Sequence, residues 1–568
     1  MMILSIVVGV TSGFAAVLIK NTVHFIKFLL TSGFVEQYQN YLYMGLPAIG
    51  IFLALVFMLY VLKRRVGHGI PITLAGISKT GGRIKPHNMY SSVITSALTV
   101  GFGGSVGLEG PTVATGAAWG SNIGRFLRLN YRQIVLLLAC ASAGAMSAIF
   151  KAPIAGIVFV LEVLMVDLTM SSLIPLLLAS LTGALTSYLF LGMHVLVPAV
   201  IQEEFIISEV PYYIILGVFT GLISVYFTRM YKTVAHSFDR LRNPFTKWIV
   251  GSVMLGVIIF FFPALYGEGY DSINASLHGD FSYLFERSIF YGLRDNIFVI
   301  FLFFILIILL KVIATSITFG SGGVGGIFAP TLFTGVNSGL LFARLFNYLG
   351  VDHLPNSHFA LAGMGGLIAG VLHAPLTGMF LIAEITGGYA LMFPLMITAT
   401  ISYAITRVFE RYSVYTYLLG RRGELFTHDK DKMVLTILKV RDLIEKNFQT
   451  IHKNANLGDL VKVIAKSERN IVPVLNDDQK LEGIVFLNDI RHIMFDRDKY
   501  DQVYVRELMY MPGTVVHPDE SMEEVAKKFQ STKHYNLPVL EDGVYKGFVS
   551  RANVFSAYRR LLRSFSEE

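Results

Sequence analysis

Two short stretches rich in glycine, each ending in proline and threonine, mark the sequence. Residues 103–112 read GGSVGLEGPT, and residues 322–331, which follow 219 positions later, read GGVGGIFAPT. A second pair recurs at nearly the same distance: APIAG at 152–156 precedes Glu162, and APLTG at 374–378 precedes Glu384. The chain therefore contains two halves of about 200 residues that are interrupted at corresponding points. This organisation is typical of transport proteins whose site lies between two repeats.

Charged residues are scarce in the first 420 residues and common after them. The chain of 568 residues has 47 Lys+Arg, 39 Asp+Glu and a mean hydropathy of +0.58. Of these, 24 basic and 23 acidic residues lie at 421–568, which leaves 23 and 16 for residues 1–420. An ordinary soluble domain carries about 25% charged residues. The sequence therefore predicts a membrane domain at 1–420 and a soluble domain after it. The net charge of +8 reflects membrane flanks and does not indicate a nucleic-acid partner.

Long apolar runs predict an all-α polytopic membrane fold. Met1–Ile19 has no basic start and no small-residue cleavage site, which favours a membrane helix over a signal peptide. Further runs occupy Tyr43–Leu62, Ile134–Ile149, Ile154–Val166, Leu173–Phe190, Tyr212–Phe227, Trp248–Leu265, Ile297–Ile317 and Phe393–Ile405. Several are too short, or too rich in glycine and proline, to cross a hydrocarbon layer of about 30 Å as straight helices. Broken helices favour a transport protein over a receptor or an anchor.

Basic clusters predict the orientation of the chain in the cell membrane. Lys63-Arg64-Arg65 and Arg421-Arg422 each follow an apolar run, so the positive-inside rule places both clusters and the C-terminal domain in the cytoplasm. In that domain, IVPVL at 471–475 and GIV at 483–485 match NLPVL at 536–540 and GFV at 547–549. These short runs alternate with amphipathic helices. We expect two α/β modules, at residues 432–497 and 503–565.

Three Gly/Pro stretches carry the chemistry of the membrane domain: GHGIP at 67–71, GLEGP at 107–111 and GIFAP at 326–330. In each, a turn containing glycine runs into a proline suited to the first turn of a helix. Backbone amides and the partial positive charge of helix N-termini can bind an anion without a full cationic charge, which would hold it too tightly to release.

The single cysteine, Cys140, excludes an intrachain disulfide and a cysteine metal cluster.

Glu109 lies in the second of these stretches. An isolated carboxylate within a membrane is a functional hypothesis by default because burying its charge is costly. Ionised, Glu109 can occupy the position of the anion, and protonated it can move away, which predicts a gate sensitive to pH and to anion concentration. The alternative is a carboxylate that only caps its helix.

These motifs together resemble the CLC family of chloride channels and chloride/proton antiporters, followed by a CBS-domain pair. The resemblance covers essentially the whole chain. It implies an intramembrane bundle of two inverted repeats, about 1–200 and 210–420, in a homodimer with one anion path per subunit. It also implies that Glu109 is the gate. By the same resemblance the anion meets His68, Gly69, Ile70, Leu108, Gly110, Ile327, Phe328 and Tyr415, with the direct contacts from position 68, the Tyr415 hydroxyl and the amides of Ile327 and Phe328.

His68 departs from the family pattern, which usually has serine there. A neutral imidazole can donate one hydrogen bond, as serine does, whereas a protonated one would add a full charge and bind an anion more tightly. Chloride is the anion that the family implies. Fluoride, nitrate and bicarbonate stay open.

Val163 is the second departure. Antiporters of the family have a Glu-Glu pair after the Ala-Pro-x-Ala-Gly segment, and the second glutamate relays protons. Here the pair is Glu162-Val163, and valine cannot hold a proton. Passive, channel-like conduction is therefore slightly favoured, with proton-coupled exchange as the alternative. We expect Glu162 and Glu384 to be structural carboxylates, although Glu162 could offer protons a detour.

The CBS pair resembles adenosine-nucleotide-binding modules. The resemblance implies a ligand loop that reads G-x-x-[ST]-x-x-D, with the hydroxyl toward the phosphate and the aspartate toward the ribose hydroxyls. The first module keeps Asp489 but lacks the hydroxyl residue, and the second keeps Ser550 but has Asn553 in place of aspartate. Each loop is half a site, so we expect a structural, dimer-stabilising role and no cofactor, with a bound adenosine nucleotide as the alternative. No HExxH motif is present, and the GxSxG match at 103–107 follows no strand, so we do not expect an enzyme.

Overall fold

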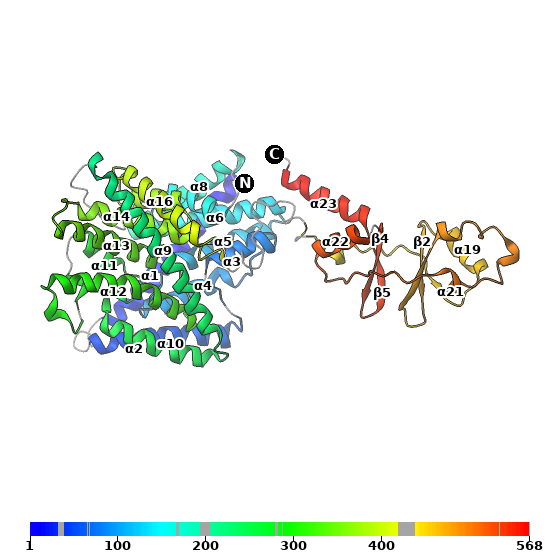
Figure 1. Cartoon of the computed structure of the whole chain (residues 1–568), viewed down its shortest axis with the longest axis horizontal. Coiled ribbons are helices and arrows are strands. Elements are labelled where there is room, and N and C mark those ends of the chain that lie inside the picture. Colours follow the sequence, from blue (N-terminus) through cyan, green and yellow to red (C-terminus); the bar gives the residue numbers. More distant parts are fainter. Residues whose placement is uncertain are drawn as a thin grey trace. The chain divides into compact units, whose positions relative to one another are not determined.

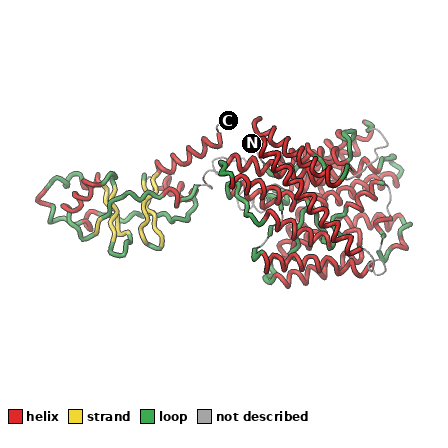
Figure 2. Tube along the Cα trace, turned by 180° about the vertical axis from the view of Figure 1, so that it is seen from behind, coloured by secondary structure: helices red, strands yellow, loops and turns green. Residues whose placement is uncertain are grey.

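The chain forms two compact units, Met1–Leu425 and Phe426–Glu568. The computed structural model describes residues 1–31, 39–64, 66–67, 69–165, 170–193, 205–278, 282–286, 288–417, 435, 438–532 and 534–566. Several features named in the sequence lie outside these residues: Arg65, His68, Arg421-Arg422 and the predicted domain limits at 200, 420 and 432. Figure 2 shows that one unit is almost entirely helical and that the strands belong to the other.

The membrane unit is built from sixteen helices among its described residues. The first eight are α1 (Met2–Thr31), α2 (Gln39–Val56), α3 (Ile70–Lys79), α4 (Asn88–Gly101), α5 (Glu109–Phe126), α6 (Tyr131–Phe150), α7 (Pro153–Glu162) and α8 (Met170–Leu191). The second eight are α9 (Val210–Asp239), α10 (Pro244–Phe261), α11 (Tyr270–Leu277), α12 (Ile297–Gly320), α13 (Phe328–Tyr348), α14 (Asn356–Leu372), α15 (Pro375–Ile385) and α16 (Met392–Phe409).

Eight helices within the described residues are long and apolar enough to cross a membrane, namely α1, α2 with the π-turn after it, α6, α8, α9, α10, α12 and α16. Each coincides with a predicted apolar run. The remaining run, Ile154–Val166, contains the ten-residue helix α7, which is too short to span the hydrocarbon layer. The prediction of an all-α polytopic fold with broken helices is therefore confirmed.

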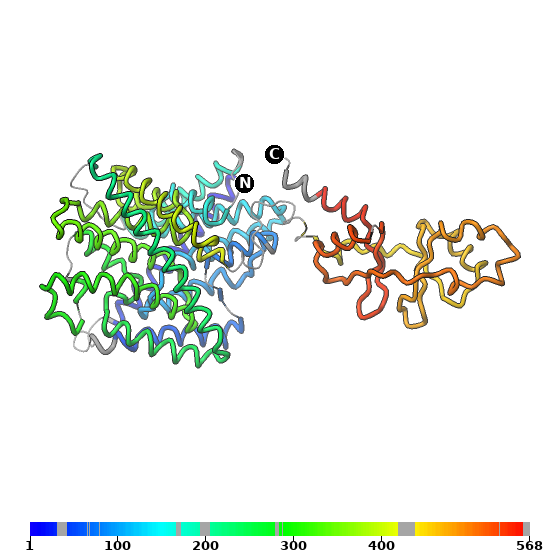
Figure 3. Tube along the Cα trace, in the orientation of Figure 1, coloured from blue at the N-terminus to red at the C-terminus, as the bar shows by residue number. Residues whose placement is uncertain are grey.

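The two halves repeat the same packing, helix for helix, with an offset of eight in the numbering. In the first half α1 and α6 both pack on α8, α5 packs on α6, and α3 packs on α5. In the second half α9 and α14 both pack on α16, α13 packs on α14, and α11 packs on α13. Figure 3 shows that the halves are interleaved, since blue α2 runs beside green α10.

Glycines allow the closest helix contacts in this unit. A Cβ built on Gly363 of α14 would lie 2.5 Å from the carbonyl oxygen of Gly335 on α13, so neither backbone could approach as it does with a side chain there. Small residues at helix contacts are the usual means of packing within a membrane, where lipid competes with apolar side chains.

The C-terminal unit contains two small sheets (Figure 1). In the first, β1 (Ile451–His452) runs parallel to β2 (Ile471–Leu475), which pairs antiparallel with β3 (Leu481–Phe486). In the second, β4 (Asn536–Glu541) pairs antiparallel with β5 (Val544–Ser550). The accompanying helices are α19 (Leu457–Lys466), α20 (Leu487–Ile490), α21 (Val505–Leu508), α22 (Met522–Thr532) and α23 (Arg551–Ser566). The two predicted α/β modules are thus present.

Candidate functional site

The three Gly/Pro stretches meet at one point in the membrane unit. Gly107 and Gly326 exchange two backbone hydrogen bonds, with N···O distances of 2.8 and 2.7 Å. A Cβ built on Gly69 would lie 2.5 Å from the carbonyl carbon of Gly110, and one built on Gly110 would lie 3.3 Å from the Cα of Gly326. The glycines therefore bring the first turns of α3, α5 and α13 together.

The three helices begin at this point. Gly69 precedes α3 with a φ of 72°, a left-handed conformation that glycine adopts without strain. Among the described residues no backbone acceptor takes the amides of Ile327 and Phe328, which begin α13. Unsatisfied amides at three converging N-termini, each with a partial positive charge, make the point attractive to an anion. The predicted anion-site residues near it are all buried: Gly69, Ile70, Leu108, Gly110, Ile327 and Phe328.

Tyr415 adds a hydroxyl to the same point. Its side chain is 4% exposed, and its Oη has no hydrogen-bond partner among the described residues. The groups whose charge or dipole reaches this hydroxyl include Glu109 and the backbone amide of Ile327. A buried donor without an acceptor costs about 1–3 kcal/mol, so this hydroxyl is suited to a ligand that supplies an acceptor.

Glu109 is the carboxylate at the centre of the site, and it is 1% exposed. Its Oε1 accepts a hydrogen bond from the hydroxyl of Tyr270 at 2.7 Å, whereas its Oε2 has no partner among the described residues. A Cβ at position 107 would collide with Oε2, so Gly107 makes room for the carboxylate. The amide of Ala329, on α13, faces the same group. Glu109 thus occupies the space on which the helix starts converge.

Tyr270 is not among the site residues predicted from the sequence. A signal was available, because Gly67-His68-Gly69-Ile70 and Gly267-Glu268-Gly269-Tyr270 are spaced 200 residues apart and open the equivalent helices α3 and α11. Gly269 has a φ of 96°, so both turns end in a left-handed glycine. Tyr270 is therefore the counterpart, in the second half, of Ile70 in the first.

Glu162 and Glu384 each cap the N-terminus of a short helix in the other half: Glu162 caps α15, and Glu384 caps α7. The carboxylate of Glu162 accepts hydrogen bonds from the amides of Leu376 and Thr377 at 2.9 and 2.7 Å, and from the Thr377 hydroxyl at 2.8 Å. Glu384 accepts from the amides of Ile154 and Ala155 at 3.0 and 2.8 Å. Both oxygens of each carboxylate are engaged. Val163, next to Glu162, is 3% exposed.

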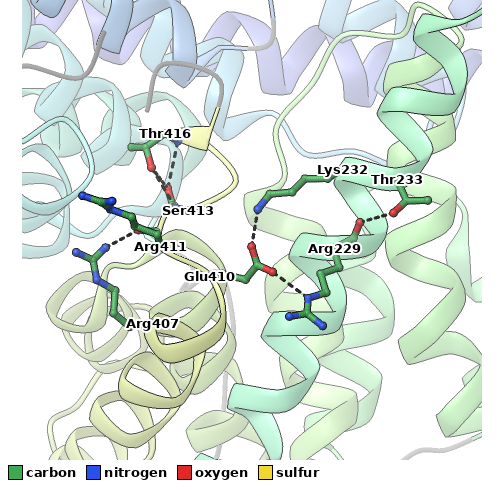
Figure 4. Close-up of polar contacts among 8 residues, drawn as sticks. All are labelled: Arg229, Lys232, Thr233, Arg407, Glu410, Arg411, Ser413 and Thr416. Carbon is green, nitrogen blue, oxygen red and sulfur yellow. Dashed lines mark hydrogen bonds and ion pairs between the residues drawn. The ribbon is translucent and has the colours of Figure 1, made fainter. Parts of the chain in front are cut away.

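A cluster of charged side chains holds the loop that carries Tyr415 (Figure 4). Glu410 follows α16 and bridges to α9 through Arg229 at 2.9 Å and Lys232 at 2.6 Å. Arg407 donates to the carbonyl of Arg411 at 2.7 Å. Burial alone would raise the pKa of Glu410, but the hydrogen bonds and positive charges of Lys232 and Arg229 outweigh it and lower that pKa below its ordinary value.

The CBS loop residues do not form one site. Asp489 is exposed on α20. Ser550 donates a hydrogen bond to Glu445, whose other oxygen pairs with Arg469 at 2.8 Å. The amide of Asn553 donates to the Ser550 hydroxyl at 3.1 Å. No hydrogen bond joins Asp489 to Ser550 or Asn553 in the part of the chain that the structure describes. Within that part, no group of three or more His, Cys, Asp or Glu side chains could hold a metal ion.

Comparison with known proteins agrees with this arrangement. Residues 49–407 match the family described as voltage gated chloride channel. The chain belongs to this family. Residues 440–496 and 505–560 each match the CBS domain, so this CLC protein is a multi-pass membrane protein with a C-terminal CBS pair.

Two relatives of this CLC protein illustrate the range of names in the family. It is 30% identical over 386 residues to a putative chloride channel protein ClcB-like of Ralstonia nicotianae, covering 66% of this chain and 85% of the relative. It is 28% identical over 440 residues to the H(+)/Cl(-) exchange transporter ClcA of Vibrio parahaemolyticus, covering 74% and 89%. The fold is similar to that of a slow cyanobacterial Cl−/H+ antiporter, with a TM-score of 0.60 and 24% identity over 74% of this chain and 97% of the antiporter.

Proposed function

We propose that the membrane unit exchanges a small anion, chloride first, for protons through a pathway gated by Glu109. The observation that carries this proposal is the position of Glu109, a buried carboxylate at a point where three helix N-termini converge. One of its oxygens has no hydrogen-bond partner among the described residues. Such a carboxylate competes with an anion for the same amides and the same hydroxyl.

The gate works through one proton. Ionised Glu109 is attracted to the helix N-termini and excludes a second negative charge from them. Protonated Glu109 loses that attraction, and an anion can take its place against the amides of Ile327 and Phe328 and the hydroxyl of Tyr415. When the anion leaves and the proton is released to the opposite side, Glu109 returns. Anion entry and proton uptake thus alternate at one position.

Exchange is better supported than passive conduction, which Val163 favoured in the sequence. Several relatives are named H(+)/Cl(-) exchange transporters, and one solved structure with this fold is a Cl−/H+ antiporter. Passive conduction is the second candidate because Val163 offers no ionisable group and the oxygens of Glu162 are already engaged. Under exchange, protons must reach Glu109 by a route that bypasses position 163.

Flux through proteoliposomes with simultaneous pH recording separates the two candidates. A chloride gradient imposed without a proton gradient should drive protons uphill in the opposite direction. Chloride movement without any proton movement, under clamped voltage, would establish passive conduction instead. Repeating the measurement with fluoride, nitrate and bicarbonate gives the anion preference. The variant His68→Ser tests position 68, and an unchanged anion ranking and pH profile would mean that the histidine acts as a plain donor.

For the C-terminal pair we propose a structural role in a homodimer that has one anion pathway per subunit. The contact that supports this role is the bridge from Glu445 to both Ser550 and Arg469, which already occupies the hydroxyl expected to face a phosphate. Thermal unfolding of the whole protein with and without ATP, ADP and AMP tests the proposal. No nucleotide should shift the transition, and a saturable shift would assign a ligand to the pair. Light scattering in detergent measures the subunit number.

A further inference from the structure

Tyr270 joins the gate to the opposite half of the molecule. Its hydroxyl donates to Oε1 of Glu109 at 2.7 Å, and this is the hydrogen bond that the structure gives to the side chain of Glu109. Glu109 begins α5 in the first half, and Tyr270 begins α11 in the second. The contact therefore crosses the interface between the repeats at the point where the anion is proposed to bind.

The turn before Tyr270 is tied to the loop before Glu109. The carbonyl of Leu265 accepts from the Ser105 hydroxyl at 2.8 Å, and the amide of Gly267 donates to the carbonyl of Gly103 at 3.0 Å. Hydrogen bonds thus join residues 265–267, which precede α11, to residues 103–105, which precede α5. These bonds hold the backbone that leads into Tyr270 beside the backbone that leads into Glu109.

Lys311 fixes the same turn from a third side. It is 0% exposed on the apolar helix α12, and its ammonium donates to the carbonyls of Gly267 at 2.9 Å and Leu265 at 3.4 Å. A cation within a membrane helix is costly and usually functional. Anchoring the turn before Tyr270 explains why a lysine lies within this apolar helix.

A cavity borders this turn. It has a volume of about 360 Å³, and the residues on either side of Tyr270, Gly269 and Asp271, line it together with Lys27 and Tyr43. Tyr43 lies near the start of α2, whereas the basic Lys63-Arg64 follows the end of that segment. By the positive-inside rule the cavity is on the non-cytoplasmic side. The residues on either side of Tyr270 therefore line a cavity on the outer side of the membrane unit.

We propose that Tyr270 is a latch, a positioning residue that holds ionised Glu109 in the anion pathway and so sets the pH at which the pathway opens. The inference rests on the proposed gating role of Glu109. A hydroxyl donor stabilises the charged carboxylate more than the protonated one. Removing the hydroxyl therefore lets Glu109 take up its proton, and leave, at a higher pH. The other groups whose charge or dipole reaches Glu109 are Glu268, on the same turn as Tyr270, Lys20 on α1 and Tyr415.

The variant Tyr270→Phe tests the latch. The pH of half-maximal chloride flux in proteoliposomes should rise by about one pH unit or more, since hydrogen bonds to charged groups contribute on that scale. Tyr266→Phe is the matched control. Tyr266 lies in the same turn, its ring packs edge-on against Tyr43 at 4.6 Å, and no hydrogen bond joins it to Glu109 among the described residues. A wild-type pH profile for Y270F, or an equal shift for Y266F, would overturn the proposal.

Two further variants separate failure of the latch from failure of the gate. Glu109→Gln should abolish the pH response, and adding Y270F to it should change nothing more, because the latch acts through Glu109. A retained pH response in E109Q contradicts the gate itself. Loss of that response in E109Q with a wild-type profile in Y270F contradicts the latch alone. If Y270F does not fold, Ser105→Ala loosens the same turn and should shift the profile in the same direction by a smaller amount. An unshifted S105A profile would then count against the latch.

Discussion

Carboxylates meet helix N-termini in two regions of the membrane unit, and they meet them differently. At the crossing of α7 and α15, Glu162 and Glu384 use both oxygens, each on the amides of the other half. At the start of α5, Glu109 lies among three helix starts, but within the part of the chain that the structure describes its side chain makes one hydrogen bond and its Oε2 has no partner. A fully bonded carboxylate is a fixed part of the fold. A half-bonded one can leave at little cost, which is what a gate requires.

The largest effect should follow from changing the gate. Glu109→Gln keeps the size of the side chain and removes its charge and its proton exchange. Flux should lose its pH dependence, and proton movement driven by a chloride gradient should stop, because no group at the site then alternates between charged and neutral. Paired chloride and pH recordings measure both. Proton coupling that survives in E109Q would place the exchanged proton elsewhere.

Changing the caps should affect stability and leave gating intact. Glu162→Ala and Glu384→Ala each remove the acceptor of two backbone amides at a helix start, which should lower the free energy of unfolding by about 1–2 kcal/mol. Thermal unfolding in detergent checks this expectation, and the two losses should be similar because the contacts are reciprocal. The pH profile of the folded variants should match the wild type. A cap variant with an altered pH profile would erase the distinction between the two regions.

Tyr415→Phe removes the unpartnered hydroxyl at the gate region. Since that donor has no acceptor among the residues that the structure describes, the fold should be unaffected, while chloride affinity should fall about fivefold, or about 1 kcal/mol. Calorimetric titration of chloride, with Tyr417→Phe as a control from the same loop, measures it. An unchanged affinity in Y415F would remove this hydroxyl from the anion site.

The smallest effect should follow from changing Glu410, a carboxylate that pairs with cationic side chains rather than with backbone amides. Its lowered pKa means that the ion pairs stabilise the fold above the ordinary pKa of 4.5 and are lost as pH falls through the lower value in the folded protein. Glu410→Gln should therefore destabilise the protein at pH 7 by about 1 kcal/mol or less, because Arg229 is 61% exposed and solvent screens the pair. The difference from wild type should shrink near pH 3. A difference that is constant with pH would mean that the charge of Glu410 does not matter.

Local rules account for what the sequence predicted. Glycine and proline spacing places Glu109, Ile327 and Phe328 at helix starts, and apolar runs locate the spanning helices, because these features depend on neighbouring residues. The Tyr270–Glu109 contact joins residues 161 positions apart, and no local pattern specifies its partner. The exchange of caps between Glu162 and Glu384 was likewise invisible, since the sequence suggested structural carboxylates without naming the amides they meet.

Single-residue departures were the weakest guides. Val163 favoured passive conduction, whereas several relatives are named exchange transporters. A single residue was a poor guide here because the absence of one proton relay says nothing about other proton routes. In the CBS pair, Ser550 was expected to face a phosphate if any ligand bound. A carboxylate from outside the motif, Glu445, accepts its hydrogen bond instead.

The exchanged caps also constrain how the chain is made. The acceptor of the amides of Ile154 and Ala155, at the start of α7, is Glu384, which is synthesised some 230 residues later. Until then the first half carries a helix end with unmet donors inside the bilayer, where such groups are costly. The halves cannot mature one after the other as finished bodies. Biosynthesis should pass through an incomplete first half that chaperones and proteases can recognise, and that becomes stable when the second half is inserted beside it.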